Sequence, residues 1–90
     1  MNLKWSDKAF SDLMLIHEVL AMVDPHLAAR AVQVLAEIPT SLRVNSRIGE
    51  RLVEFSPSDV RRLVVGKYEV RYEIREAAIY VLRLCRTREQ

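Results

Sequence analysis

The clearest pattern of apolar and polar positions lies between residues 68 and 75, where the two kinds alternate. A period of two predicts a strand with one buried and one wetted face. The residues of the apolar face are Tyr68, Val70, Tyr72 and Ile74. A second strand is predicted over Val60 to Val65, and Gly66-Lys67 lies between the two. Because glycine supplies the positive φ that a type II′ turn needs at its first position, we predict a β-hairpin.

Apolar residues spaced three and four apart predict two helices before this hairpin. The first is expected to start after Ser6, whose hydroxyl can cap free N–H groups, and to run to about Val23. Its core-facing stripe is Ala9, Phe10, Leu13, Ile16 and Leu20. The second is expected to open with Asp24 as N-cap and Pro25 at the first helical position, and to end at Pro39. Its apolar side is Leu27, Ala28, Ala31, Val32, Val34, Leu35 and Ile38.

The remaining segments are shorter. Leu3 to Trp5 is predicted as a strand with Trp5 as its apolar anchor, residues 40 to 50 as a polar surface loop, and Arg51 to Phe55 as a further short strand. Residues 56 to 59 are predicted to form a turn. The run Ile79 to Cys85 is apolar on both faces through Leu84, which is typical of a central strand covered on both sides.

The resulting order is β-α-α-β-β-β-β. We therefore predict an α+β fold of two layers, in which two N-terminal helices cover one face of a small, mostly antiparallel sheet and the arginines lie on the other face.

Length and composition restrict the class of protein. Ninety residues predict one domain over residues 1–90, half of them apolar, and no segment approaches the roughly 18 apolar residues of a spanning helix. The start MNLKWSDK has no secretory pattern, so we expect a cytoplasmic protein. The single cysteine, Cys85, lies in an apolar strand and is expected to be a small core residue.

Charge is unevenly distributed along the chain. Residues 1 to 40 carry three basic and five acidic residues, a net charge of −2, whereas residues 41 to 90 carry eleven basic and seven acidic residues, a net charge of +4. A basic half predicts an acidic partner, either nucleic acid or an acidic protein segment.

The candidate site residues are arginines. One cysteine and two histidines cannot supply a zinc site, and no glycine-rich phosphate loop is present, so we expect neither a metal nor a cofactor. The basic cluster is Arg61, Arg62, Arg71, Arg75, Arg83, Arg86 and Arg88. Arg71 and Arg75 alternate with acids and are interpreted as a solvated face. Arg83, Arg86 and Arg88 lie at the end of an otherwise apolar central strand with few acids nearby, and we expect them to bind the molecule on which the protein acts.

Several segments together resemble the ParE branch of the ParE/RelE toxin superfamily. The residues that carry this resemblance are Trp5, Ala9, Asp12-Leu13 and Ile16, Glu54-Phe55-Ser56-Pro57, Val60-Arg61-Arg62-Leu63, Tyr68 to Ile74, Ile79 to Leu84, and Arg86-Thr87-Arg88-Glu89. The resemblance implies the toxin of a type II toxin-antitoxin module for plasmid stabilisation, silenced by an antitoxin in a hetero-oligomer, with no membrane association. RelE-like members cut mRNA on the ribosome, whereas ParE-like members poison DNA gyrase.

Proton chemistry favours the second activity. Cleavage at the 2′-hydroxyl of RNA needs a group that accepts a proton, and arginine does not release its own. Where many family members have a histidine this chain has Arg86, Glu69 replaces an arginine of the nucleases, and the sequence ends at Gln90 without a terminal tyrosine or histidine. If the chain is a nuclease, the resemblance assigns catalysis to Arg62, Arg86 and Arg88. A ribosome-dependent mRNA endonuclease and an inactive antitoxin-binding relative remain the alternatives to a gyrase poison.

Overall fold

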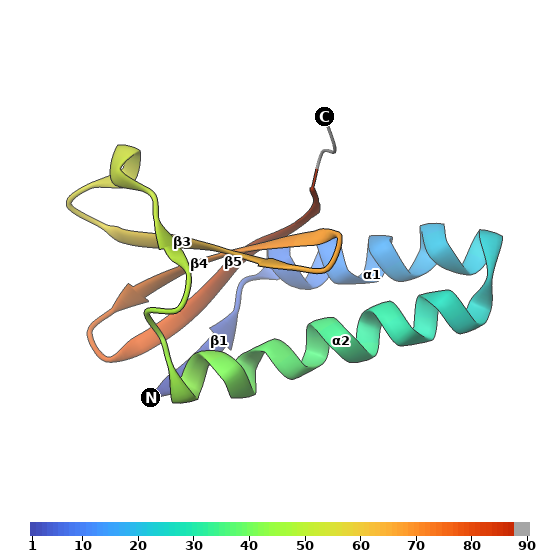
Figure 1. Cartoon of the computed structure of the whole chain (residues 1–90), viewed down its shortest axis with the longest axis horizontal. Helices are drawn as coiled ribbons and strands as arrows, with labels where there is room; N and C mark the ends of the chain where they lie inside the picture. The colour runs from blue at the N-terminus through green and yellow to red at the C-terminus, as the bar shows by residue number, and fades with distance from the viewer. Residues whose placement is uncertain (88–90) are drawn as a thin grey trace.

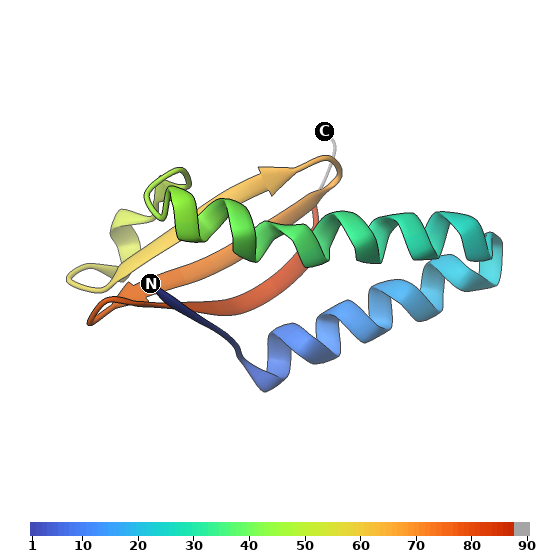
Figure 2. The same cartoon turned by 90° about the horizontal axis from the view of Figure 1, so that it is seen from below.

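The computed structural model describes residues 1–87, which form one five-stranded sheet with two helices on one of its faces (Figures 1 and 2). The elements are β1 Asn2–Trp5, α1 Asp7–Val23, α2 Pro25–Val44, β2 Glu50–Arg51, the 3₁₀ helix η1 Val53–Phe55, β3 Asp59–Val65, β4 Tyr68–Arg75 and β5 Ala78–Arg86. The strand order is β1-β5-β4-β3-β2, with β1 parallel to β5 and the other pairs antiparallel. The predicted α+β fold is confirmed.

Both predicted N-caps are confirmed. The Ser6 hydroxyl accepts a hydrogen bond from the Ala9 N–H at 3.0 Å and donates one to the Leu82 carbonyl at 2.9 Å, so one side chain starts α1 and ties it to β5. The Asp24 carboxylate accepts from the His26 N–H at 2.9 Å, with Pro25 at the first helical position. Each cap satisfies an N–H group that the first turn of a helix leaves unpaired.

The predicted end of the second helix at Pro39 is wrong, because α2 continues to Val44. Proline cannot donate to the carbonyl one turn earlier, which usually ends a helix. Here Ile38 and Leu42 are both buried in the core, one on each side of Pro39. Burial of a leucine contributes about 2 kcal/mol, which offsets much of the missing bond. The predicted loop 40 to 50 shrinks accordingly to residues 45 to 49.

The predicted strand Arg51 to Phe55 is also wrong. Only Glu50 and Arg51 pair with β3, and the chain then turns into η1. The Leu52 N–H donates to the Val60 carbonyl at 2.8 Å, and the Phe55 N–H donates back to the Leu52 carbonyl at 3.1 Å. Because Val53 and Phe55 are exposed, this segment has no apolar face to hold it as a strand.

The core lies between the helices and the sheet. Its buried residues are Ala9, Leu35, Ile38, Leu42, Val70, Tyr72, Ile79, Val81 and Leu84. Trp5 packs against it as predicted. The hairpin around Gly66 is confirmed, with a φ of +60° at that glycine and Val65 opposite Tyr68.

A register shift between β4 and β5 changes which residues of β5 face the helices. Arg71 pairs with Arg83 and Tyr72 with Val81, so Leu82 has no partner on β4. The extra residue reverses the alternation, which places Leu84 rather than Arg83 in the core. Cys85 is consequently exposed on the face away from the helices, which we call the open face, and its predicted core position is wrong. The expectation that this strand is covered on both sides is also wrong, because both helices lie on one face of the sheet.

The helical hairpin is longer than the sheet that it covers. The turn between α1 and α2 projects past the end of the strands (Figures 1 and 2). Met22 and Val23 near this turn are 87% and 81% exposed. The projecting part of the two helices therefore presents apolar surface that the sheet does not cover.

Candidate partner-binding groove and arginine network

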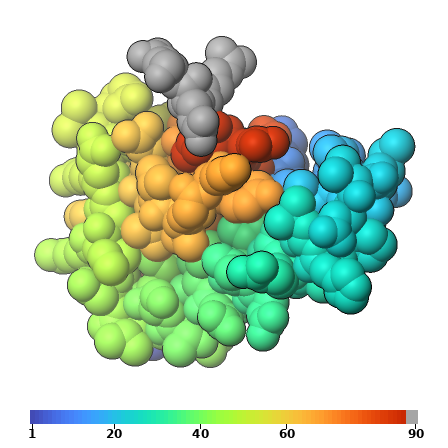
Figure 3. Space-filling view, turned by 45° about the vertical axis from the view of Figure 1, so that its right-hand side comes forward, coloured from blue at the N-terminus to red at the C-terminus, as the bar shows by residue number. Residues whose placement is uncertain are grey.

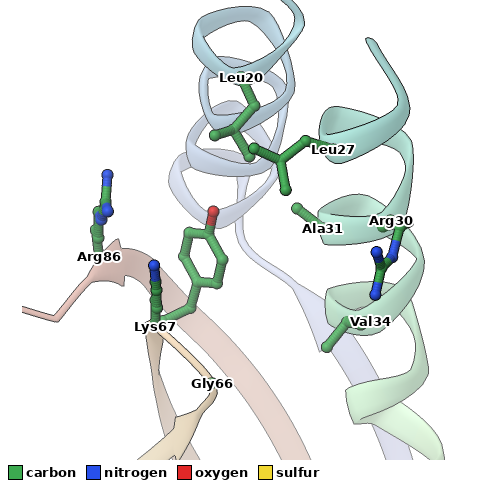
Figure 4. Close-up of a pocket in the computed structure, with 9 residues that line it drawn as sticks. Leu20, Leu27, Arg30, Ala31, Val34, Gly66, Lys67 and Arg86 are labelled. Atoms are coloured by element: carbon green, nitrogen blue, oxygen red, sulfur yellow. The ribbon is translucent and has the colours of Figure 1, made fainter. Parts of the chain in front are cut away.

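An apolar pocket of about 410 Å³ lies between the projecting helices and the β3–β4 turn. Leu20 of α1 and Leu27 and Ala31 of α2 converge on one side of it, while Lys67 and Arg86 rise on the other (Figure 4). The pocket exists because the helical hairpin continues beyond the strands, so that these apolar residues have only the turn opposite them.

A second pocket of about 200 Å³ extends this concavity along α1. It shares Leu20, Tyr68 and Arg86 with the first pocket and adds Leu15 and Val19, both more than half exposed. We call the combined concavity the apolar groove and define it by Leu15, Val19, Leu20, Leu27, Ala31, Val34 and Tyr68. The space-filling view shows the two sides of this groove next to each other, the hairpin of β3 and β4 in orange and the helices in cyan to teal (Figure 3).

Three basic residues surround the apolar groove. Arg30, Lys67 and Arg86 line it, and among residues 1–87 no acidic residue does. Within residues 1–87 none of the three forms an ion pair with a carboxylate. An apolar floor with a positive rim fits an amphipathic segment that carries acidic residues.

Two arginines of the open face, Arg62 and Arg71, are paired with acids of the chain, whereas Arg75 lies 4.4 Å from the centre of the Tyr80 ring and forms no ion pair within residues 1–87. Arg62 contacts Glu50 at 3.2 Å and Glu69 at 3.4 Å, and Arg71 contacts Glu69 at 3.3 Å. The Arg71 guanidinium also lies 5.6 Å from the centre of the Phe55 ring. The interpretation of Arg71 as part of a charged face paired with acids agrees with these contacts.

Arg61 holds the loop at residues 45 to 49. Its guanidinium contacts Asp59 at 2.9 Å and donates to the carbonyls of Gly49 and Arg47 at 2.9 and 3.2 Å. Tyr72 holds the same loop from the core side, where its hydroxyl donates to the Ser46 carbonyl at 2.7 Å and accepts from the Gly49 N–H at 2.9 Å. Burial raises the pKa of the Tyr72 phenol, so the hydroxyl stays protonated and keeps its donor role.

Arg83 forms a two-point contact with Asp12 of α1. Its Nε and Nη2 lie 2.8 and 3.2 Å from the two carboxylate oxygens, and the Leu84 N–H donates to the same carboxylate at 2.9 Å. Strand β1 ends opposite Val81, so without Asp12 this N–H would lack a strand partner. Desolvation opposes ionisation of Asp12, but the bonds from Arg83 and Leu84 outweigh it and lower the pKa of the carboxyl.

The structure places the predicted target-binding residues in different surroundings. Arg83 is bound to Asp12, Arg86 lines the apolar groove, and Arg88 lies outside the described residues. Arg86 also lines a concavity of about 690 Å³ on the open face together with Arg62, Glu69 and Cys85. Two of the residues assigned to catalysis in the nuclease alternative, Arg62 and Arg86, thus share one concavity.

Sequence reasoning missed Arg30 and Lys67 as site residues. Arg30 lies between Leu27 and Val34 on α2, and those two were assigned to the buried side, although both are exposed along the groove. The basic residue Arg30 among apolar residues of α2 was the one feature of the sequence that could have indicated a binding surface there. Nothing in the sequence indicated that the β3–β4 turn would bring Lys67 opposite α2.

Other classes of site find no support in residues 1–87. These residues contain no group of three or more histidine, cysteine or acidic residues that could hold a metal. His17 and His26 are exposed on the helices. Neither helix in this part of the chain is both long and apolar enough to cross a membrane.

Comparison with known proteins identifies the family. Residues 3–90 match the profile of the ParE toxin of type II toxin-antitoxin system, parDE, and the chain belongs to this family. A chain of the solved structure titled "Chromosomal ParDE TA system from P. aeruginosa" superposes with a TM-score of 0.80 at 27% identity, over 98% of this chain and 97% of that one. No functionally curated protein matches the sequence significantly. The resemblance to the ParE branch is confirmed.

Proposed function

We propose that this chain is the toxin of a toxin-antitoxin pair and that its antitoxin silences it by occupying the apolar groove. The observation that supports this is the groove itself, where exposed leucine and valine side chains are surrounded by Arg30, Lys67 and Arg86, and where the described part of the chain places no acid. An amphipathic helix docks by placing residues spaced three and four apart into such a groove, and acidic residues on its flanks would meet the basic rim. A bound segment would also cover Arg86.

The antitoxin test uses the protein encoded next to this chain. Val34 and Val44 lie on the same helix, 46% and 85% exposed, but only Val34 lines the groove. Val34→Asp should weaken binding in calorimetry at least tenfold, because it places a charge in an apolar contact, whereas Val44→Asp should change it less than twofold. Equal affinities of the two variants would show that the antitoxin binds outside the groove.

We further propose that DNA gyrase is the target and that Arg83, Arg86 and Arg88 contact it. Proton chemistry supports this proposal over RNA cleavage. The more buried of the two carboxylates that contact Arg62 is Glu69, and each of its oxygens is bound by a guanidinium, Oε1 by Arg62 and Oε2 by Arg71. The Glu69 carboxylate is thus engaged by two arginines of the chain itself and is not directed at a substrate hydroxyl, as a general base would have to be.

The target test adds the purified chain to gyrase and supercoiled plasmid. Loss of supercoiling and accumulation of cleaved complex are expected, and Arg86→Ala should weaken both while the melting temperature stays within a few degrees, since surface substitutions change stability by about 0.5 kcal/mol or less. Normal gyrase activity together with cuts in ribosome-bound mRNA would replace this proposal by the nuclease alternative.

A further inference from the structure

Three arginines stand side by side across the sheet. Arg62 of β3 is opposite Arg71 of β4, and Arg71 is opposite Arg83 of β5. Arg83 turns to Asp12 at the edge, whereas Arg62 and Arg71 stay on the open face with side chains 41% and 38% exposed. Like charges in cross-strand positions repel each other, so this arrangement needs an anion between the two guanidinium groups.

Glu69 is that anion. Its side chain is only 13% exposed, and its two oxygens divide between Arg62 and Arg71 at 3.4 and 3.3 Å. It lies opposite Val64 and Cys85 on the same face and contributes to the wall of the 690 Å³ concavity. A carboxylate placed between two guanidinium groups occupies the position that an external anion would take, because carboxylates and phosphates bind guanidinium in the same two-point geometry.

We propose that Arg62 and Arg71 form a site for the phosphate backbone of single-stranded nucleic acid, and that Glu69 keeps this site closed. Glu69 and Glu50 balance the two arginines, so an approaching phosphate meets no net positive charge there. Without the charge of Glu69 the face gains one positive charge, and Arg86 on the wall of the concavity adds a second. Glu69 is thus the residue that directs this basic protein away from nucleic acid, whichever target the apolar groove and Arg86 serve.

The test compares two substitutions on one strand. Glu69→Gln removes the closing charge with almost no change in shape. Glu73→Gln makes the same change in net charge on the same face of β4, at a residue that forms no ion pair within residues 1–87. Binding of the full chain to a fluorescein-labelled 12-nucleotide oligouridine is measured by anisotropy between 50 and 200 mM salt.

Glu69→Gln should bind the oligonucleotide about tenfold more tightly than the wild-type chain. Its plot of log affinity against log salt should steepen by about 1.4, since two newly contacted phosphates contribute about 0.7 each. The sole cysteine, Cys85, lines the same concavity, so bound oligonucleotide should slow its alkylation in the Glu69→Gln variant. Adding Arg62→Ala to Glu69→Gln should abolish the gain.

Two outcomes would overturn the proposal. If Glu69→Gln and Glu73→Gln behave alike, the effect is one of net charge and not of a site. If the wild-type chain already binds the oligonucleotide as tightly as Glu69→Gln does, the Glu69 carboxylate does not prevent binding. A melting curve confirms that each variant is folded, and because gyrase is absent from the assay, the result is separate from that of the gyrase experiment.

Discussion

Asp12 is a carboxylate with two structural tasks, since it binds the Arg83 guanidinium and accepts the Leu84 N–H at the edge of β5. Both contacts need the ionised form, which is why its folded-state pKa lies below the usual 3.8. A depressed pKa contributes stability that is present above about pH 4 and is lost as the pH falls through the folded-state value. The ion pair is therefore a stabilising feature at neutral pH and an acid-sensitive one.

Asp12→Asn should reduce stability at pH 7 by about 1 to 2 kcal/mol, because a charged acceptor for a partly buried N–H is replaced by a neutral one. The deficit should shrink as the pH falls below about 4, since the unfolded wild-type chain then takes up a proton that the folded Asp12 binds less readily. Urea unfolding of both proteins at pH 7, 5, 4 and 3 checks this. Asp7→Asn, one turn earlier on α1 and without an ion pair in residues 1–87, is the control, and a pH-independent deficit for Asp12→Asn would contradict the prediction.

Cys85 is an exposed residue whose thiol is expected to react slowly. The residue is exposed, but partial burial of its thiol raises the pKa, and the nearby carboxylate of Glu69 raises it further. Because the thiolate is the reacting form, alkylation by iodoacetamide at pH 8 should be several-fold slower than that of a free cysteine. Glu69→Gln, without nucleic acid, should speed it by removing the negative charge. An alkylation rate equal to that of free cysteine would show that the thiol is not perturbed.

The loop between α2 and β2 depends on a glycine for reasons of space. A Cβ atom at Gly49 would lie 2.7 Å from the Tyr72 hydroxyl oxygen and 2.9 Å from the Arg62 carbonyl. The hydroxyl cannot move away without losing its bonds to Ser46 and Gly49 inside the core. Tyr72 therefore links the position of this loop to the packing of β4.

Gly49→Ala should destabilise the protein by about 2 to 4 kcal/mol, since it combines overpacking with the loss of buried hydrogen bonds. Tyr72→Phe removes the shortest of these contacts, the one to the hydroxyl, whereas the ring Cε1 and the Arg62 carbonyl stay 2.9 Å from the added methyl group. It loses the same bonds, so the double variant should be less unstable than the sum of the single ones. Thermal unfolding of the four proteins measures this coupling. Exactly additive losses would mean that the clash with Tyr72 is not the cause.

The elements that sequence could predict are those set by local chemistry. Two helix starts and one turn could be predicted because they depend on residues only a few positions apart: the caps Ser6 and Asp24, and Gly66 in the turn. The errors arose where distant contacts decide. Helix α2 continues past Pro39 because Leu42 is buried in the core. Cys85 faces away from the helices because the pairing of β5 with β4 leaves Leu82 without a partner. Neither contact is encoded in a local pattern.

The same distinction applies to the candidate site. Arg86 was predicted from its place at the end of an apolar strand, and it lies in the groove. Arg30 and Lys67 are 37 residues apart in the chain and meet only because the helical hairpin projects past the β3–β4 turn. Arg83 and Asp12 are 71 residues apart in the chain, so the sequence did not indicate that they would form an ion pair. A net charge of +4 over residues 41 to 90 indicated an acidic partner but not which arginines remain available to it.

The distribution of ion pairs over the whole molecule leads to a final prediction. Among residues 1–87, Arg61, Arg62, Arg71 and Arg83 are paired with carboxylates of the chain, whereas the three basic residues around the apolar groove are not. Attraction of an acidic antitoxin should therefore concentrate at the groove. Removing Arg30, Lys67 and Arg86 together by Gln substitution should weaken antitoxin binding about tenfold at 50 mM salt, mainly through slower association.

A matched variant separates this local effect from total charge. Lys8→Gln, Arg43→Gln and Arg47→Gln remove the same three charges from exposed residues that do not line the groove. Association rates from surface plasmon resonance at 50, 150 and 500 mM salt should fall steeply for the wild-type and this control chain, but only weakly for the groove variant, because salt screens a charge effect that the groove variant has already lost. The same salt dependence in all three proteins would show that the toxin attracts its antitoxin through its overall charge and not through the rim of the groove.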